Sequence, residues 1–136
     1  MNARVFSLYG SGQTSNLIAN MIQRVKTGEE ITLAGGKGMF LTPFFVDDAV
    51  ESFLKLMKMP LPNSRCVVNL AGDEVLSLFD VVSSISKVVG KAPVIDNTEE
   101  NPKYLCGDNS RLKKYFGIDS FVSFEEGIRK TLSAQV

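Results

Sequence analysis

Glycines at positions 10 and 12 form the first pattern that could carry chemistry. The motif Gly10-x-Gly12-x-x-Ser15 lies between an expected strand and an expected helix, like the glycine turn that lets a backbone approach a pyrophosphate. Serine replaces the third glycine of that turn. The nearest acidic residues, Glu29 and Glu30, precede the next strand, whereas a ribose-binding carboxylate follows it. We therefore expect no dinucleotide to bind at this turn.

A serine and a lysine three residues apart, Ser84 and Lys87, match the spacing of a serine–lysine nucleophile pair. Ser84 lies in the middle of an expected helix, with no companion motif and no strained turn to present its hydroxyl. The match is therefore interpreted as chance, and no catalytic nucleophile is expected.

Two adjacent carboxylates, Asp47 and Asp48, could in principle hold a metal or act as an acid/base pair. Adjacent side chains on a helix diverge, and the sequence contains no histidine to share either task. A carboxylate at a helix start accepts hydrogen bonds from unpaired N–H groups and favours the positive end of the helix dipole. We predict that these residues cap a helix, and that the chain has no metal site.

Composition narrows the class of protein. The chain has 136 residues, of which 44% are hydrophobic and 22% charged, as in one soluble globular domain. Fifteen basic residues balance fifteen acidic ones without a basic run, so neither nucleic acid nor a membrane is an expected partner. No apolar run approaches the ~20 residues that span a bilayer, and residues 1–4 do not lead into a signal-peptide core. A cytoplasmic location is therefore expected.

The stretch at residues 42–58 organises the expected fold, because an extended apolar segment runs directly into a helix. Apolar residues recur in that helix at three- and four-residue spacing, which predicts one stripe that packs on a core. They are Val46, Ala49, Val50, Phe53, Leu54 and Met57. The nearly all-apolar residues 66–72 follow and end in glycine, as a strand buried on both faces of a parallel sheet does.

The remaining chain alternates short strands with amphipathic helices. Strands are expected at residues 4–9, 30–34 and 93–96, and helices at 15–26, at 77–89, around 110–116 and from 123 onward. Ser15 or Asn16 can cap the first helix, and Ser77 with Asp80 forms a capping box. The expected fold class is α/β, with short parallel strands flanked by amphipathic helices.

Five segments resemble one protein family, and they occur in its order. They are RVFSLYGSGQ at 4–13, FVDDA at 45–49, VNLAG at 68–72, GDNSRLK at 107–113 and SFEEG at 123–127. They are similar to the R-x-x-N-x-Y-G-P-x-Q, V-x-D-x-A, Y-N-L-G, D-x-S-K and S-L-E-E-G segments of the NAD-dependent epimerase/dehydratase proteins, which are extended short-chain dehydrogenases. The matches in register over the whole chain carry the resemblance.

The resemblance implies the C-terminal, substrate-binding portion of a Rossmann-type enzyme. Family members also have a glycine-rich NAD(P) turn and a Tyr-x-x-x-Lys pair, whereas Gln13, Asp108 and Asp119 stand four residues after the three tyrosines here. One domain over residues 1–136 is therefore expected, with the N-terminal dinucleotide-binding domain absent. The chain is expected to bind no cofactor and to lack catalysis alone, while NAD or NADP serves the complete parent protein.

The resemblance also implies a substrate site for a nucleotide sugar. Ser7 stands where the family has an asparagine that contacts the substrate, and Asn16 stands at the helix start that holds the diphosphate. Thr32, Leu33 and Ala34 match the short strand that packs on the nucleotide base.

Two arginines with which many family members bind the diphosphate have no counterpart here. One corresponds to Leu41, and the loop at residues 98–103 contains no arginine either. A bidentate charged contact contributes about 1.5–3 kcal/mol. Diphosphate binding is therefore expected to weaken by several orders of magnitude unless Lys37 or Lys103 compensates.

The expected function is the substrate-binding portion of an NAD(P)-dependent nucleotide-sugar epimerase, dehydratase or reductase. The alternative is a non-enzymatic truncated homologue or an assembly module that binds no cofactor. A full-length gene or neighbouring reading frame with the glycine-rich turn and the Tyr–Lys pair would favour the first. A third interpretation, a complete small nucleotide-binding enzyme that uses residues 10–15, requires a following strand with an acidic end, which the sequence does not show.

Association is expected because the resemblance leaves strands and a helix without their usual neighbours. In the family, further strands flank those at residues 5–8 and 66–70, and the helix at 46–57 packs over that sheet. Exposed strand edges and apolar faces favour pairing with another chain, and a symmetric dimer covers the same patch twice. The expected homodimer buries Phe6, Leu8, Phe44, Phe45 or Val67. The alternative is a monomer whose last helix covers the exposed face.

Overall fold

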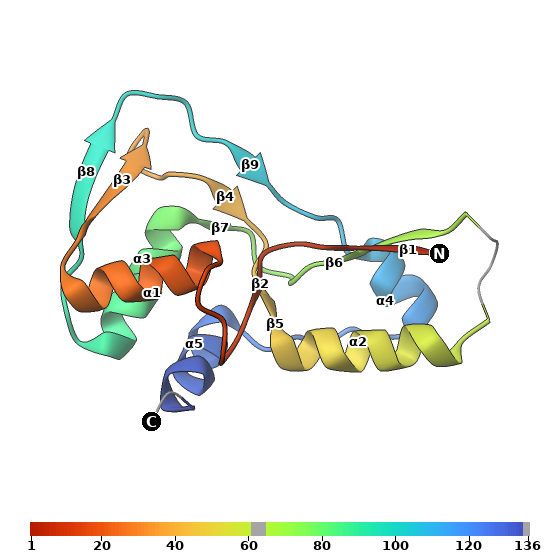
Figure 1. Ribbon diagram of the computed structural model, residues 1–136. Coiled ribbons are helices and arrows are strands. Elements are labelled where there is room, and N and C mark those ends of the chain that lie inside the picture. Colours follow the sequence, from red (N-terminus) through yellow and green to blue (C-terminus); the bar gives the residue numbers. More distant parts are fainter. Residues whose placement is uncertain (61–64, 135–136) are drawn as a thin grey trace.

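The computed structural model describes residues 1–60 and 65–134, which form short strands and five helices. The strands are β1 (Asn2–Val5), β2 (Leu8–Tyr9), β3 (Glu30–Ala34), β4 (Phe40–Leu41), β5 (Phe44–Phe45), β6 (Val67–Leu70), β7 (Leu76–Ser77), β8 (Val94–Thr98) and β9 (Tyr104–Leu105). The helices are α1 (Leu17–Thr27), α2 (Val46–Lys58), α3 (Leu78–Val89), α4 (Ser110–Phe116) and α5 (Phe124–Ser133). The predicted α/β class is confirmed (Figure 1).

The strands pair in four small sheets. β1 pairs with β6, β2 with β5 and β3 with β8, all in parallel, while β4 lies between antiparallel β7 and parallel β9. Parallel strands need long crossover connections, so each parallel pair joins segments that are distant in the sequence. Among the described residues, none of the helices combines the length and apolar character that a membrane span requires.

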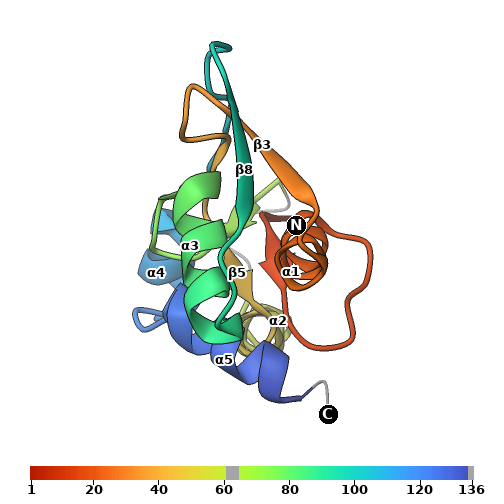
Figure 2. The same cartoon turned by 90° about the vertical axis from the view of Figure 1, so that its left-hand side faces the viewer.

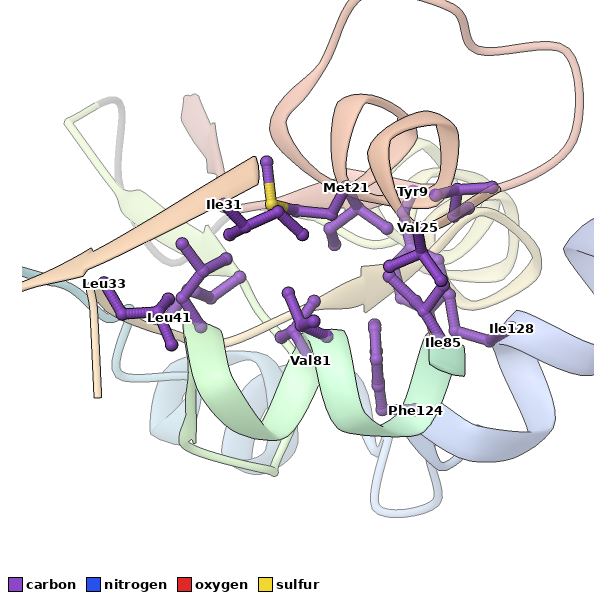
Figure 3. Packing of buried hydrophobic residues seen from close by; sticks show 14 of the residues in the cluster. Tyr9, Met21, Val25, Ile31, Leu33, Leu41, Val81, Ile85, Phe124 and Ile128 are labelled. Carbon is purple, nitrogen blue, oxygen red and sulfur yellow. The ribbon is translucent and has the colours of Figure 1, made fainter. Parts of the chain in front are cut away.

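The larger core lies between β3 and three helices. Contacts join α1 to α3, and α3 to α5. Figure 2 shows α3 and α1 on either side of the lower end of β8, with α5 beneath them. Ile31, Val81 and Phe124 come from three elements and point toward one another (Figure 3). The amphipathic helices predicted at 15–26 and 77–89 therefore bury their apolar sides as α1 and α3, and α5 also contributes buried residues to this core. Full burial of a side chain of this size contributes about 1.5–3 kcal/mol.

Local capping fixes where these helices begin. Asn16, rather than Ser15, caps α1 by accepting a hydrogen bond from the Ala19 N–H at 2.8 Å. Ser77 and Asp80 form the predicted capping box of α3. Both predicted starts lie within two residues of the observed ones, because the capping chemistry is local.

The smaller core lies between the β1–β6 pair, α2 and α4. Its buried members include Phe44, Val68, Leu112 and Phe116. In β6, Val68 and Leu70 are fully buried, whereas Val67 and Asn69, which alternate with them, are only half-buried. The prediction that this strand is buried on both faces is therefore wrong, because one face of the β1–β6 pair is only partly covered.

The start of α2 also differs from the prediction. The cap residue is Phe45, which makes no side-chain capping bond, and Asp47 and Asp48 lie within the first turn. The Asp48 carboxylate accepts a hydrogen bond from the Val122 N–H at 3.0 Å and is 8% exposed. Asp48 therefore holds the segment before α5 against α2, and it does not cap a helix.

The apolar residues of α2 are divided between the inside and the outside of the molecule. Ala49, Ser52 and Leu56 are buried. The exposed residues are Val50, Phe53, Leu54 and Met57, with 54%, 41%, 47% and 73% of their surfaces accessible. The prediction that these four pack on the chain's own core is wrong, because periodicity identifies an apolar face without showing what covers it.

The predicted strand at residues 4–9 is interrupted. β1 ends at Val5 and β2 begins at Leu8, because Ser7 between them has a φ of 45° and breaks the extended backbone. The predicted strand at 93–96 is β8, which extends to Thr98 where it pairs with β3.

Two residues of the predicted dimer interface lie inside the chain. Phe44 and Phe45 are 0% and 4% exposed. The ring of Tyr9 packs between Phe45 and Phe124, with centroid distances of 5.4 and 5.1 Å. Helix α5 therefore covers this region, and neither Phe44 nor Phe45 is available to a partner.

Candidate functional site

A cavity of about 390 Å³ lies where the first strands meet the start of α1. This α1 cavity is lined by Val5, Ser7, Leu8, Gln13, Asn16, Leu17 and Ile18. Its polar side chains are a hydroxyl and two amides, and the lining carries no charge. The first N–H groups of α1 have no intrahelical partner, so this end of the helix suits a hydrogen-bond acceptor.

Ser7, which lines the α1 cavity, has an unusual backbone conformation. Among the described residues it is the only non-glycine residue with a positive φ, at 45°. Such conformations are costly for residues with a side chain and persist where the surroundings hold them. Here the Ser7 carbonyl accepts a hydrogen bond from the Phe44 N–H at 3.1 Å, which ties the kink to β5.

Asn16 lies in the same cavity, but its amide is already engaged. Its Nδ2 donates to the Leu8 carbonyl at 2.9 Å and to the Gln13 side chain, and its Oδ1 accepts from the Ala19 N–H. Both amide hydrogens are therefore used within the chain. Asn16 positions the loop at the helix start, and only its remaining oxygen lone pair is free for a ligand.

A second cavity, of about 210 Å³, lies beside the end of β3. This β3 cavity is lined by Thr32, Ala34, Gly38, Met39, Leu78, Glu100, Asn101 and Lys103. Thr32 and Ala34 point outward because side chains alternate along a strand. Gly38 has a φ of 71°, and a Cβ there would lie 2.8 Å from the Leu78 Cβ. A glycine is therefore needed for the turn to approach α3.

The structure places the seven predicted substrate residues in three groups. Ser7 and Asn16 share the α1 cavity, and Thr32, Ala34 and Lys103 share the β3 cavity. Leu33 is 0% exposed, so its side chain belongs to the core and only its backbone can reach a ligand. Lys37 is exposed and lines neither cavity, although its carbonyl accepts a hydrogen bond from Phe79.

Sequence reasoning missed three polar groups that these cavities contain. Gln13 orients Asn16, and Glu100 and Asn101 face the same cavity as Lys103. Gln13 could have been predicted as a site residue, because it is the last residue of the segment at 4–13 that resembles the family. No sequence motif marks Glu100 and Asn101 as site residues. Their loop reaches the cavity only because β8 pairs with β3.

The electrostatics of the two cavities are nearly neutral. Along their linings in the described part of the chain, Lys103 is the one cationic side chain, and the Glu100 carboxylate shares its cavity. An anionic ligand would therefore meet one positive and one negative group. This arrangement favours hydrogen bonding over strong ionic attraction.

The buried Tyr9 lines neither the α1 cavity nor the β3 cavity. The pKa of the buried Tyr9 hydroxyl is raised well above its usual value, chiefly by burial and then by Glu74 and Asp48. This hydroxyl therefore stays protonated. Over residues 1–60 and 65–134, no group of three or more histidine, cysteine or acidic side chains could hold a metal ion.

Comparisons with known proteins find sugar-nucleotide enzymes among the proteins that this chain resembles. No family profile matches it. It is 26% identical to UDP-glucuronic acid decarboxylase 1 of Danio rerio, with 96% of this chain and 32% of that protein covered, and 23% identical to decarboxylase 6 of Arabidopsis thaliana, with 93% and 38% covered. The chain thus spans about a third of the length of these curated relatives.

Solved structures agree on the fold. The Bacillus cereus UDP-glucuronic acid 4-epimerase, in complex with UDP-glucuronic acid and NAD, matches with a TM-score of 0.82 at 20% identity, over 96% of this chain and 43% of that one. The Thermus thermophilus UDP-glucose 4-epimerase, in complex with NAD, matches with a TM-score of 0.76 at 23% identity, over 96% and 44%. The resemblance to the C-terminal part of NAD-dependent epimerase/dehydratase proteins is confirmed. The fold is that of the C-terminal portion of Rossmann-type extended short-chain dehydrogenases.

One position at which the sequence differs from the epimerase/dehydratase pattern lies in the core. Leu41, which the sequence resemblance matches to an arginine of many members, is 0% exposed and belongs to the larger core. A long cationic side chain would not fit there without losing this packing. The core packing of this chain therefore favours leucine over arginine at position 41.

Proposed function

We propose that this chain is the substrate-binding portion of an NAD(P)-dependent enzyme that acts on a nucleotide sugar by epimerisation, dehydration, decarboxylation or reduction. The observation that supports it is the match of 96% of the chain to an epimerase that was solved with UDP-glucuronic acid and NAD. In this proposal the protein is cytoplasmic, as its composition favours.

The two cavities divide the ligand between them. The β3 cavity offers an open strand face at Thr32 and Ala34, which suits a flat base, and Lys103 beside it for a phosphate oxygen. The α1 cavity offers the helix start and the Ser7 hydroxyl, which suit the phosphate and hydroxyl oxygens of the sugar side. The near neutrality of both linings predicts weak binding.

The cofactor is assigned to another part of the enzyme. Neither cavity offers a glycine turn followed by a ribose-binding carboxylate, and none of the three tyrosines has a lysine four residues on. In this proposal NAD(P) and the Tyr–Lys pair come from a dinucleotide-binding domain outside residues 1–136, so the chain alone has no catalytic activity.

Ligand titration followed by two-dimensional amide NMR tests this proposal. UDP and UDP-glucuronic acid are expected to shift signals of residues 32–34 and 16–18, with a Kd near the millimolar range, and NAD is expected to shift none. Lys103→Ala should weaken UDP binding by about tenfold, because it removes the one cation of the cavity. Lys114→Ala, which changes an exposed lysine of α4, is the matched control and should bind like wild type.

The alternative is a non-enzymatic homologue or assembly module. Two observations favour it: Asn16 is engaged within the chain, and Leu41 replaces a binding arginine with core packing. Absence of any UDP-dependent shift at 10 mM in a folded chain would contradict substrate binding and support this alternative. The homodimer expected from the sequence is compatible with both functions and is also proposed.

A further inference from the structure

The α1 cavity, which is the proposed place of the sugar side of the ligand, has an uncharged lining. Four of its lining residues are aliphatic, namely Val5, Leu8, Leu17 and Ile18. The other three, Ser7, Gln13 and Asn16, are polar and neutral. Residues 5–23 contain all of them and include no lysine, arginine, aspartate or glutamate. A ligand group in this cavity therefore meets no charged side chain of its lining.

The cations that flank this segment face other parts of the molecule. Arg4 precedes Val5 in β1, and side chains alternate along a strand, so Arg4 lines a different cavity, beside β6. Arg24 lies in the last turn of α1, where its guanidinium donates a hydrogen bond to the Glu30 carbonyl at 2.7 Å. Lys103 lines the β3 cavity. These three side chains therefore provide no positive charge to the lining of the α1 cavity.

The polar side chains of the α1 cavity offer few donors to a ligand. Both amide hydrogens of Asn16 are used within the chain, by the Leu8 carbonyl and by the Gln13 side-chain oxygen. The side-chain donors that remain in the lining are the Ser7 hydroxyl and the Gln13 amide group. The N–H groups at the start of α1 are assigned to a phosphate oxygen in the proposed function. These groups suit the neutral hydroxyls of a sugar.

A small adjoining cavity extends the same uncharged environment. It shares Gln13, Asn16 and Ile18 with the α1 cavity, and it adds the side chains of Tyr9 and Thr131. Both of these carry hydroxyl groups, and the buried Tyr9 hydroxyl stays protonated because its pKa is raised by burial. A ligand group that turns toward this side therefore finds no cation either.

An ionised sugar carboxylate is poorly matched to such a lining. Transfer of an ion out of water costs much more free energy than transfer of a hydroxyl or a methylene group, unless an opposite charge receives it. The ligand of the Bacillus cereus epimerase, UDP-glucuronic acid, carries a carboxylate of this kind. Similarity of fold therefore points to a uronic acid, whereas the cavity lining of this chain points away from one.

We propose that the sugar accepted by this chain is uncharged: the ligand is a nucleoside diphosphate linked to a neutral hexose or pentose, and not to a uronic acid. This inference rests on the proposed function, in which the α1 cavity receives the sugar side, and it names the class of sugar. The aliphatic lining residues contact sugar carbons, and the Ser7 hydroxyl and the Gln13 amide group bind neutral hydroxyls.

A series of ligands that differ at one sugar carbon tests the proposal. UDP-xylose, UDP-glucose and UDP-glucuronic acid carry a hydrogen, a hydroxymethyl group and a carboxylate on C5 of the sugar. Each is titrated at pH 7 and followed by the amide signals of residues 16–18, with UDP as the reference for the nucleotide part. UDP-xylose and UDP-glucose should bind at least as tightly as UDP. UDP-glucuronic acid should bind at least about tenfold more weakly than UDP-glucose.

Addition of a cation to the lining should reverse this preference. Val5 is 42% exposed, so Val5→Arg places a guanidinium at the mouth of the α1 cavity. The affinity for UDP-glucuronic acid relative to UDP-glucose should rise about tenfold or more. Val5→Gln, which is long and neutral, should keep the wild-type ratio. Val94→Arg should also keep it, because Val94 is 46% exposed in β8 and lines neither cavity. Thermal unfolding establishes that each variant is folded.

Two results would overturn the proposal while UDP still binds. They are a wild type that binds UDP-glucuronic acid as tightly as UDP-glucose, and a folded Val5→Arg variant with an unchanged ratio. The comparison of ligands on the wild type does not depend on the folding of any variant. Absence of binding by UDP and by all three UDP-sugars would overturn the proposed function and this inference with it, so the two failures are distinguishable.

Discussion

Asp48 lies at the predicted place in the chain, but its observed role differs from the predicted one. Its place at the start of a helix predicts a cap, but its carboxylate accepts a hydrogen bond from Val122, 74 residues away in the chain. The pKa of Asp48 is raised, chiefly by burial, although the Val122 hydrogen bond lowers it and Glu51 and Asp47 raise it. A distant backbone partner cannot be read from local spacing.

Removal of the Asp48 carboxylate is expected to destabilise the chain. Asp48→Ala leaves the partly buried Val122 N–H without its acceptor, which costs about 1–3 kcal/mol. Asp48→Asn keeps an acceptor oxygen and should cost less. Asp47→Ala is the matched control, because Asp47 is exposed on the same helical turn and should change stability by less than about 0.5 kcal/mol. Urea unfolding at pH 7 measures these differences, and equal costs for Asp47→Ala and Asp48→Ala would indicate a helix-start effect instead.

The raised pKa of Asp48 also sets the sign of a pH dependence. The folded state holds its proton more tightly than the unfolded state, whose value is near 3.8. The stability from this group is therefore fully present below pH 3.8 and is lost as pH rises through the raised folded-state pKa. The stability of the wild type relative to Asp48→Asn should fall over that range. A relative rise would contradict the direction.

At the residue scale the candidate site was only partly predictable. The resemblance predicted Ser7 and Asn16 as site residues, and both line the α1 cavity. The engagement of the Asn16 amide could not be predicted, since its acceptor, the Leu8 carbonyl, is presented only after the Ser7 kink. Leu33 was assigned to a ligand surface, but strand alternation turns its side chain into the core.

At the scale of elements, periodicity and capping predicted helices well. Helices α1, α3 and α5 begin within two residues of their predicted starts, and α1 and α3 bury their predicted apolar sides. Helix α2 was also placed correctly, but its stripe includes both an inner and an outer face. A sequence pattern reports which residues avoid water, and it does not distinguish the chain's own core from a contact with another surface.

Helix α5 docks through a glycine, which gives a prediction at this scale. A Cβ at Gly127 would lie 2.0 Å from the Tyr9 hydroxyl oxygen. Gly127→Ala gains up to about 1 kcal/mol of helix propensity, but overpacking of this contact should cost about 1–3 kcal/mol. The net expectation is destabilisation in urea unfolding.

A double-mutant cycle locates that strain. Tyr9→Phe removes the nearest atom and leaves ring carbon as the close contact, at 2.7 Å. Gly127→Ala should therefore cost less in the Tyr9→Phe background than in the wild type. Additive costs would mean that the strain lies elsewhere along α5.

At the scale of the whole molecule, two cores of unequal size share one chain. The larger joins α1, α3 and α5 to β3, and the smaller joins α2 and α4 to the β1–β6 pair. The sequence predicted a single layered domain, because each element has one clear apolar pattern. The division arises from the non-local pairings of β1 with β6 and of β3 with β8, which local patterns do not encode.

Amide hydrogen exchange should show that the helices of the two cores differ in stability. Opening of α2 loses the contacts of its one buried side, whereas opening of α3 disrupts the larger core, in which Val81 and Ile85 are fully buried. Local openings with less buried apolar surface cost less free energy. Amides of α3 should therefore exchange at least tenfold more slowly than those of α2, a difference of about 1.4 kcal/mol. Equal protection of the two helices would show that both cores open only together, as one cooperative unit.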